Sequence, residues 1–397
     1  MSDDFIFTSE SVTRGHPDKL CDQVSDAIVD HCLSLDPSSG IIAECAVASG
    51  VLFISAHYAA KRGFAIPDVA RDVIRGIGYP QDVFDPDSCA IMTSFMDHSE
   101  RDYHRLDLDA MSDSDLGRLT AKDQVTVFGY ACDQTDALMP LPIWLAHRLA
   151  RRLDEETVKR SIPDLLPDAK TQVGVEYVNN APSRIYSIAI ETSQRRADKP
   201  DPEALRAAVS EHVIGPVFAD ESIKPDGDTR LFINPEGPLI GGGPAAHSGL
   251  TGRKTGIDTY GEFARHSGAA LSGKDPMRID RVGAYAGRWA AKNVVAAGLA
   301  RECEVQLSYS IGAAGPVSVR VRTSGSSGGI ADADIAKRLS DTFDFRLGAI
   351  VRDLGLRRLP AENPDGFYQR LAVYGHMGRV DLEMPWERLD RVDALKA

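Results

Sequence analysis

The chain has 397 residues, of which 43% are hydrophobic and 26% charged, a composition typical of a globular protein with two or three domains. Its formal net charge of −13 and the lack of a long Lys/Arg run argue against a protein that wraps nucleic acid, but they leave room for a local basic pocket. No signal-peptide pattern begins the sequence, no apolar run reaches about 18 residues, and none of the six cysteines forms a C-x-x-C pair. We therefore expect a cytoplasmic protein with reduced thiols, no nucleic-acid partner and no membrane partner.

The first predicted helix covers residues 16–34. Its apolar stripe recurs at four-residue spacing and consists of Leu20, Val24, Ile28 and Cys32. Asp18, Asp22 and Asp26 recur at the same spacing on another face, where like charges repel by about 0.2–0.5 kcal/mol per pair. A cation close to Asp18 would relieve this repulsion.

The rest of the chain alternates between extended and helical patterns, which predicts α/β or α+β units. Residues 97–122 are polar and Asp-rich, and they predict a long loop of the kind that often serves as a lid or a binding loop. The other predicted elements are an extended segment at 41–59, a helix at 142–153, strands at 171–177 and 184–191, a helix at 203–214, a glycine-rich loop at 234–256 and a small-residue helix at 280–299.

The segment Gly-His-Pro-Asp-Lys at 15–19 stands at the start of the first predicted helix. Free N–H groups and the helix dipole attract anions there, and His16 and Lys19 add donors. Asp18 can hold a hard cation such as Mg²⁺, which prefers carboxylate and phosphate oxygens. A capped surface helix start carries the same residue types, so this segment alone leaves both readings open.

Three further segments, 241–254, 272–280 and 168–170, are rich in cations, and the last two carry separated aspartates. In the first, glycines let backbone N–H groups approach an anion next to Arg253 and Lys254, although the Gly-Lys-Ser/Thr order of a P-loop is absent. In the second, Lys274 and Arg278 accompany Asp280. Alone, the first is also compatible with a mobile surface loop and the second with an exposed turn whose local ion pairs are worth under about 1 kcal/mol each, while the third is almost uninformative. Together they favour an enzyme that handles a polyphosphate with bound Mg²⁺.

Several motifs resemble those of the methionine adenosyltransferase (S-adenosylmethionine synthetase) family, in the same order along nearly the whole chain. They are FTSESV at 7–12, GHPDK at 15–19, FGYA at 128–131, LMP at 138–140, DAK at 168–170, FINP at 232–235, GLTGRK at 249–254, DTYG at 258–261, SGKDP at 272–276, DR at 280–281, SYSIG at 308–312 and YGH at 374–376.

The resemblance implies an α+β fold of three similar domains in a pseudo-threefold arrangement, which we expect at 4–101, 117–232 and 233–385. It implies an enzyme that joins methionine sulfur to C5′ of ATP, releases tripolyphosphate and cleaves it to phosphate and pyrophosphate. It also implies two Mg²⁺ ions, activation by K⁺, and a homodimer with active sites between subunits that can pair into a tetramer.

The same resemblance assigns roles to individual residues. His16 would contact the leaving oxygen, and Asp18 and Asp280 would bind Mg²⁺. Glu44 corresponds to the K⁺ ligand. The residues assigned to ATP and its phosphates are Asp123 (in the family's mobile gate), Asp168, Lys170, Arg253, Lys254 and Lys274. The residues assigned to the amino-acid pocket are His57, His98, His247, Arg278 and Ile311.

The chain departs from the family pattern mainly in that pocket. The family usually has Glu, Gln and Asp where this chain has His57, His98 and His247, and Arg278 replaces a Lys. Arg14 replaces a usual Glu. The aromatic residue that follows Asn-Pro-x-Gly is missing, since Pro238 and Leu239 stand there, and the gate reads Lys-Asp-Gln-Val at 122–125 in place of a glycine-rich sequence.

Three interpretations of the histidines stay open. They are tolerated variation around methionine, or they adapt the pocket to a different sulfur or selenium nucleophile, since imidazoles suit a carboxylate or a neutral donor better than an ammonium. Alternatively, the three histidines bind a transition metal. Two other functions remain in view: a tripolyphosphate or nucleotide hydrolase that lost adenosyl transfer, and a non-catalytic partner subunit. Retention of the metal and phosphate residues argues against the latter.

Overall fold

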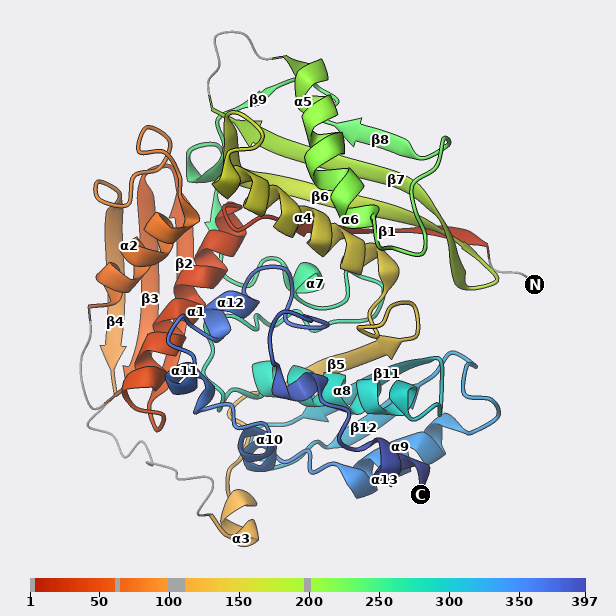
Figure 1. The fold of residues 1–397 in the computed structure, drawn as a ribbon. Coiled ribbons are helices and arrows are strands. Elements are labelled where there is room, and N and C mark those ends of the chain that lie inside the picture. The colour runs from red at the N-terminus through yellow and green to blue at the C-terminus, as the bar shows by residue number, and fades with distance from the viewer. Residues whose placement is uncertain (1–3, 61–64, 99–110, 196–200) are drawn as a thin grey trace.

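The computed structural model of the protein describes residues 4–60, 65–98, 111–195 and 201–397. It contains three β-sheets that form three sides of the molecule, with one long helix on the inner face of each (Figure 1). The predicted α+β class is confirmed. In the described part of the chain, no helix is both long and apolar enough to cross a membrane.

One unit, a long helix followed by an antiparallel hairpin, occurs three times along the chain. The units are α1 (Pro17–Leu35) with β2 (Gly40–Ala48) and β3 (Val51–Ala59), α4 (Leu141–Lys159) with β6 (Leu165–Val178) and β7 (Ala181–Gln194), and α8 (Ile279–Ala296) with β11 (Glu302–Tyr309) and β12 (Ser318–Arg322). The three helices are similar in length, at 19, 19 and 18 residues.

The strand that precedes each long helix pairs with the hairpin of another unit. β1 (Phe5–Val12) pairs with β6, β5 (Val125–Cys132) pairs with β11, and β10 (Gly249–Leu250) pairs with β2, all antiparallel. The exchange is cyclic, so the first segment of the chain completes the second sheet, the second completes the third, and the third completes the first. Every sheet therefore contains strands from two segments of the chain.

The remaining elements extend the sheets or cover them. α2 (Ile66–Ile77) leads to β4 (Ala90–Asp97), which is parallel to β3. α5 (Pro202–Val209), the π-helical turn η1 (Ser210–Ile214) and α6 (Gly215–Phe218) lead to β8 (Arg230–Ile233) and β9 (Leu239–Ile240), both parallel to β7. The shorter helices are α3 (Asp113–Leu116), η2 (Gly243–Ala245), α7 (Thr255–Asp258), α9 (Asp332–Thr342), α10 (Leu347–Asp353), α11 (Leu359–Glu362), α12 (Tyr368–Leu371), η3 (Pro385–Glu387) and α13 (Val392–Lys396).

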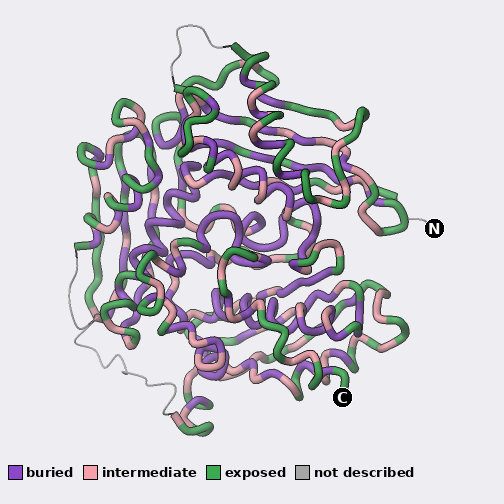
Figure 2. The backbone as a smooth tube through the Cα atoms, in the orientation of Figure 1, coloured by how far each residue is buried: buried purple, intermediate pink, exposed green. Residues whose placement is uncertain are grey.

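The predicted helices and strands are present, with differences at their ends. The predicted loop at 234–256, however, contains the short strands β9 and β10 and the turn η2, because strands of two residues are too short to show an alternating pattern. The helix predicted at 142–153 runs to Lys159, and the extended segment at 41–59 is the hairpin β2–β3. Residues 113–116 of the predicted 97–122 loop form a short helix, and 99–110 lie outside the described residues. Buried residues concentrate between the sheets, whereas β4 is exposed along most of its length (Figure 2).

The small-residue helix α8 packs with its backbone close to β5. A Cβ added at Gly129 of β5 would come within 1.8 Å of the Gly287 backbone of α8. No other residue fits this crossing, which explains why the helix sequence is rich in Gly and Ala.

The acidic face of α1 is buried against loops from the third segment of the chain. Asp18 accepts the backbone N–H of Leu250 at 3.0 Å, and Asp22 accepts that of Gly252 at 2.7 Å. Two more turns continue the pattern: Asp26 accepts the N–H of Gly273 at 2.8 Å, and Asp30 accepts those of Tyr368 and Gln369 at 2.9 Å each. We call Asp18, Asp22, Asp26 and Asp30 the acidic stripe. Its repulsion is relieved by these backbone donors and by two buried cations, Lys19 at Asp22 and Arg281 at Asp26, and the guanidinium of Arg253 lies 3.9 Å from Asp18.

Replacing Asp26 by Ala is expected to lower the free energy of unfolding by about 3–5 kcal/mol. Arg281 binds both Asp26 oxygens, at 2.7 and 3.0 Å, and both side chains are 0% exposed, so the substitution leaves a buried guanidinium unpaired. Urea unfolding followed by circular dichroism measures the loss, with Asp26→Asn as a milder variant.

The matched control is Asp341→Ala, which removes an exposed ion pair with Lys337 on α9 and should cost less than about 0.5 kcal/mol. A loss below about 1 kcal/mol for both Asp26 variants would contradict a structural role of this pair.

Asp30 is expected to make stability fall as the pH rises. Burial raises the pKa of Asp30 from 3.8 to about 7. The folded protein thus holds this proton more tightly than the unfolded chain does, and the resulting stabilisation is present below about pH 4 and lost as the pH rises through about 7. Because Asp30→Asn cannot ionise, the difference in unfolding free energy, wild type minus variant, should fall between pH 5 and 8. A difference that is flat over this range would show that Asp30 does not titrate there.

Candidate functional site

The turn between β1 and α1, residues 13–16, is fixed against the start of β6. Thr13 donates its N–H to the Ala169 carbonyl at 3.0 Å, and Gly15 donates to the Pro167 carbonyl at 3.1 Å. A Cβ at Gly15 would come within 2.6 Å of the Pro167 backbone, so only glycine fits there. This contact brings His16 beside Asp168.

His16 is a buried, neutral hydrogen-bond donor. It is 4% exposed, and its Nδ1 accepts the backbone N–H of Asp18 at 3.2 Å. Because Nδ1 is an acceptor, the proton of the neutral ring resides on Nε2. Burial lowers the pKa of His16 to about 3; Asp168 opposes this shift, while nearby positive groups, Lys254 first among them, reinforce it. At neutral pH the ring therefore offers an uncharged N–H donor.

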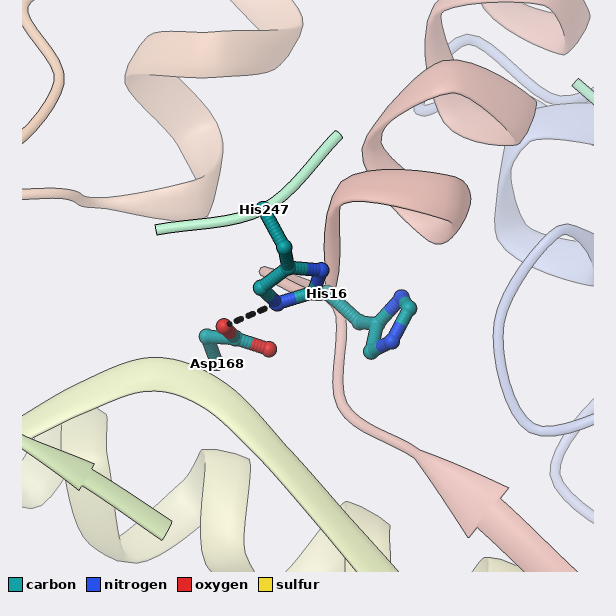
Figure 3. Close-up of side chains that lie close together, drawn as sticks. All are labelled: His16, Asp168 and His247. Carbon is teal, nitrogen blue, oxygen red and sulfur yellow. Dashed lines mark hydrogen bonds and ion pairs between the residues drawn. The ribbon is translucent and has the colours of Figure 1, made fainter. Parts of the chain in front are cut away.

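His247 and Asp168 form a hydrogen-bonded pair next to His16 (Figure 3). His247 Nε2 lies 2.9 Å from Asp168 Oδ2, which also accepts the Gly243 N–H at 2.7 Å. The ring centroids of His16 and His247 are 5.0 Å apart in an edge-to-face arrangement. The sequence assigned these three residues to different parts of the substrate, and the structure brings them together.

These three side chains do not have the hydrogen-bonding arrangement of a metal site. Their potential ligand atoms lie within 4.8 Å of one another. However, a metal-binding imidazole keeps its proton on the other ring nitrogen and donates it outward, whereas Nδ1 of His16 accepts a backbone N–H. Nε2 of His247 faces a carboxylate that it can satisfy by donating. The arrangement is therefore one of hydrogen-bond donors.

The hypothesis that His57, His98 and His247 form one metal set within the chain is wrong for the described residues. His57 and His98 do lie together, with ring centroids 5.9 Å apart at the edge of β3 and β4, but His247 belongs to the His16 cluster. Among the described residues, the group found close enough to share a metal ion is His16, Asp168 and His247.

Two cations predicted to bind phosphate, Lys170 and Lys254, lie close to this cluster, and a third, Arg253, lies near Asp18. Lys170 and Lys254 both lower the pKa of His16. Each also forms an ion pair of 3.3 Å, Lys170 with Glu191 and Lys254 with Glu10. The side chain of Arg253 is exposed, and its Nη1 lies 3.9 Å from Asp18 Oδ1. A positive potential beside a neutral donor suits a polyphosphate.

Lys19, which the sequence suggested as a further donor for an anion, has a structural role. Its ammonium is 0% exposed, binds Asp22 at 2.9 Å and is hydrogen-bonded to Asp258. Its pKa is raised because the attraction of these two carboxylates exceeds the effect of burial. It therefore faces the core and not the His16 cluster.

The second cationic segment, 272–280, lies along β2. Gly273 accepts the Ala43 N–H at 2.8 Å, and Asp275 donates its N–H to the Ile41 carbonyl at 3.1 Å. Farther along the same strand, Thr251 donates to the Cys45 carbonyl at 3.0 Å, so the exposed Glu44 lies between the two loops. In this segment Lys274 Nζ lies 3.3 Å from Asp280 Oδ1, and Arg278 Nε lies 3.9 Å from Asp275 Oδ2.

Asp123 and Ile311 form another group, on the third sheet. Ile311 is 62% exposed and Asp123 is exposed. Their segments meet where Gly312 donates its N–H to the Ala121 carbonyl at 3.0 Å. In the described part of the chain, the predicted site residues thus fall into four groups: the His16 cluster, the residues along β2, the His57–His98 pair and this group.

Two cavities in the described structure lie away from the predicted site residues. One of ≈450 Å³ lies between α4 and residues 374–381, and one of ≈830 Å³ lies where β5, the β6–β7 turn and residues 322–326 meet. The sequence reasoning also missed Asp154 of α4, a buried carboxylate that contacts the turn before His16. Its position in an amphipathic helix among other charges gives no sequence signal.

The triplicated helix–hairpin fold and the cationic cluster define an α+β enzyme that handles polyphosphates. The chain belongs to the S-adenosylmethionine synthetase family: the models of its N-terminal, central and C-terminal domains match residues 4–100, 118–239 and 241–388.

Similar proteins include the S-adenosylmethionine synthases of three organisms. The identity is 45% over 406 residues for Thermosynechococcus vestitus, covering 99% of this chain and 97% of the relative. It is 45% over 408 residues for Gloeobacter violaceus, with the same coverage, and 43% over 415 residues for Synechocystis sp., covering 100% and 96%.

Proposed function

We propose that this chain forms S-adenosylmethionine from ATP and methionine, and that it cleaves the released tripolyphosphate to phosphate and pyrophosphate. The observation that carries the proposal, beside family membership, is the neutral His16 with its proton on Nε2 close to Lys170 and Lys254, with Arg253 beside Asp18. This set of groups suits a reaction whose leaving group is a polyphosphate. The division into domains at 4–101, 117–232 and 233–385 belongs to the same proposal.

The chemistry requires charge stabilisation more than proton transfer. A sulfur lone pair of methionine forms a bond to C5′ of ATP while the C5′–O bond breaks and its electrons stay on the tripolyphosphate oxygen. The sulfur becomes a sulfonium, so no general base is needed. His16 Nε2–H would donate to the leaving oxygen, and Lys170, Arg253, Lys254 and Lys274 would hold the phosphates. A water molecule then cleaves the tripolyphosphate in the same cationic environment.

Asp18 and Asp280 have the chemistry that Mg²⁺ prefers. Both carboxylates are buried, and in the described structure Asp18 Oδ2 accepts no hydrogen bond. One oxygen of Asp280, Oδ1, lies 3.3 Å from Lys274 Nζ. Bound Mg²⁺ would neutralise phosphate charge and help to orient the chain of phosphates. Glu44 offers one exposed carboxylate to K⁺. The requirement for K⁺ and the number of Mg²⁺ ions stay predictions.

A homodimer, or a tetramer of paired dimers, with the active site between subunits is the assembly that we propose. Phe53 of β3 and its register neighbour Met92 of β4 are 40% and 58% exposed, and Met96, which faces His57, is 50% exposed. An apolar sheet face of this kind favours burial against a partner. The separation of His57, His98, Asp123 and Ile311 from the His16 cluster within one chain supports a site completed by a second copy.

Incubation with ATP, Mg²⁺, K⁺ and methionine is expected to yield S-adenosylmethionine, detected by mass spectrometry. His16→Ala should lower kcat by about 10²–10³-fold, because it removes a donor aimed at the leaving oxygen. His31→Ala, on an exposed part of the same helix, is the matched control and should retain wild-type kcat. Release of phosphate without a sulfonium product would instead identify a hydrolase.

A second candidate function is the same adenosyl transfer to a different sulfur or selenium nucleophile. The observation that favours it is the His247–Asp168 pair, together with the His57–His98 pair, at positions that the family resemblance assigns to the amino-acid pocket. Imidazoles in place of carboxylates reduce the attraction for an ammonium group.

His247→Asp is expected to shift the preference toward methionine. It places a second carboxylate beside Asp168, so the ratio of kcat/KM for methionine to that for 4-(methylthio)butanoate, which differs from methionine by lacking the ammonium, should rise about tenfold. His247→Asn keeps a neutral N–H donor and should leave the ratio unchanged. A competition assay measures the ratio, and equal ratios in all three proteins would remove His247 from substrate selection.

A further inference from the structure

Asp154 of α4 contacts two other segments of the chain, at Arg14 and at Tyr374. Arg14 is two residues from His16. Asp154 is 2% exposed, and its Oδ2 accepts the backbone N–H of Arg14 at 2.9 Å. The Nε of Arg14 lies 3.6 Å from the same oxygen, and Tyr374 donates its hydroxyl hydrogen bond to it. One carboxylate oxygen thus receives groups from the turn after β1 and from the loop before residue 376.

The other peptide groups of the turn have partners of their own. Gln23 Nε2 donates to the Arg14 carbonyl at 2.7 Å, Tyr79 donates its hydroxyl to the Gly15 carbonyl, and His16 donates its N–H to the Thr13 carbonyl at 3.1 Å. Asp154 is the acceptor for the one N–H left, that of Arg14. Without the carboxylate this N–H would lack its partner, and the turn would lose its tie to α4.

Charge adds to the hydrogen bonds. Arg14 is the cation that faces Asp154, and Tyr374 and Tyr79 are the other titratable groups whose charge interacts with it. Burial raises the pKa of Asp154 to about 6, with Arg14 acting against the shift. The carboxylate is therefore ionised at neutral pH and becomes protonated in mildly acidic solution.

We propose that Asp154 is a positioning residue, which holds the turn at Arg14 so that Nε2 of His16 points at the leaving oxygen. This inference rests on the proposed function of His16. Asp154 touches no substrate in this scheme; it acts through the backbone of Arg14. A misplacement of a catalytic donor by about 1 Å costs on the order of 10²-fold in rate, so loosening the turn is expected to lower kcat without altering the groups that bind ATP.

The first test compares Asp154→Ala and Asp154→Asn with the wild type. Asp154→Ala should lower kcat by about 10- to 100-fold with KM for ATP within about threefold, because the phosphate cations stay in place. Asp154→Asn keeps an acceptor of the same size, so its kcat should lie between those of the wild type and Asp154→Ala. The matched control is Glu155→Gln, the next residue on α4, whose side chain is 45% exposed and pairs with Arg152; it should retain wild-type kcat.

The pH profile separates positioning from a merely structural role. The wild-type kcat should decline below about pH 6 as Asp154 takes up a proton and loses its charge interaction with Arg14. Asp154→Asn should lack this acidic limb. An identical limb in both proteins would overturn the assignment.

Hydrogen exchange followed by mass spectrometry tests the position of the turn without any reaction. The peptide that contains residues 13–18 should exchange faster in Asp154→Ala than in the wild type or in Glu155→Gln, while peptides of β6 and β7 keep their protection. Unchanged exchange at the turn, or a wild-type kcat in folded Asp154→Ala, would overturn the proposal. So would faster exchange along the whole of α4, which would indicate general loosening. If the wild type forms no S-adenosylmethionine, the proposed function fails, but the exchange result still decides whether Asp154 holds the turn.

Discussion

The acidic stripe of α1 is the constraint on which the rest of the structure depends. Its four carboxylates accept backbone N–H groups from residues 250, 252, 273, 368 and 369. Hydrogen bonds to buried charged groups contribute about 1.5–3 kcal/mol each, and the penalty for leaving such a carboxylate unpaired is larger. The stripe therefore fixes the loops that carry Arg253, Lys254 and Lys274 relative to His16, which begins the same helix.

The cyclic exchange of strands reinforces this arrangement. Because β1 lies in the second sheet, the chain leaves that sheet at Val12, next to Lys170, and enters α1 a few residues later. The turn that carries His16 is thus held between two elements of the second unit, by Pro167 and Ala169 of β6 on one side and by Asp154 of α4 on the other. A site built at such a junction depends on the docking of all three units, and no single unit contains its full set of groups.

Much of the fold could be predicted from residue patterns. The four-residue apolar repeat of α1 and the small-residue composition of α8 both located helices, since each reflects a face that must be buried. The pattern could not reveal that strands are exchanged between segments, because a strand has the same alternation whichever neighbour it pairs with. Nor could it reveal the partners of the acidic stripe, since backbone N–H groups have no sequence signature.

For the candidate site, the sequence by itself determined the chemical inventory: a histidine at a helix start, separated aspartates, and lysines and arginines in glycine-rich loops. Only the tertiary structure decided how these groups act. It turned Lys19 inward to Asp22 and Asp258, separated His247 from His57 and His98, and joined it to Asp168. It also fixed the proton of His16 on Nε2 through the N–H of Asp18. The physical reason is that burial, hydrogen-bond partners and tautomer depend on contacts between residues far apart in the chain, which residue type and spacing do not encode.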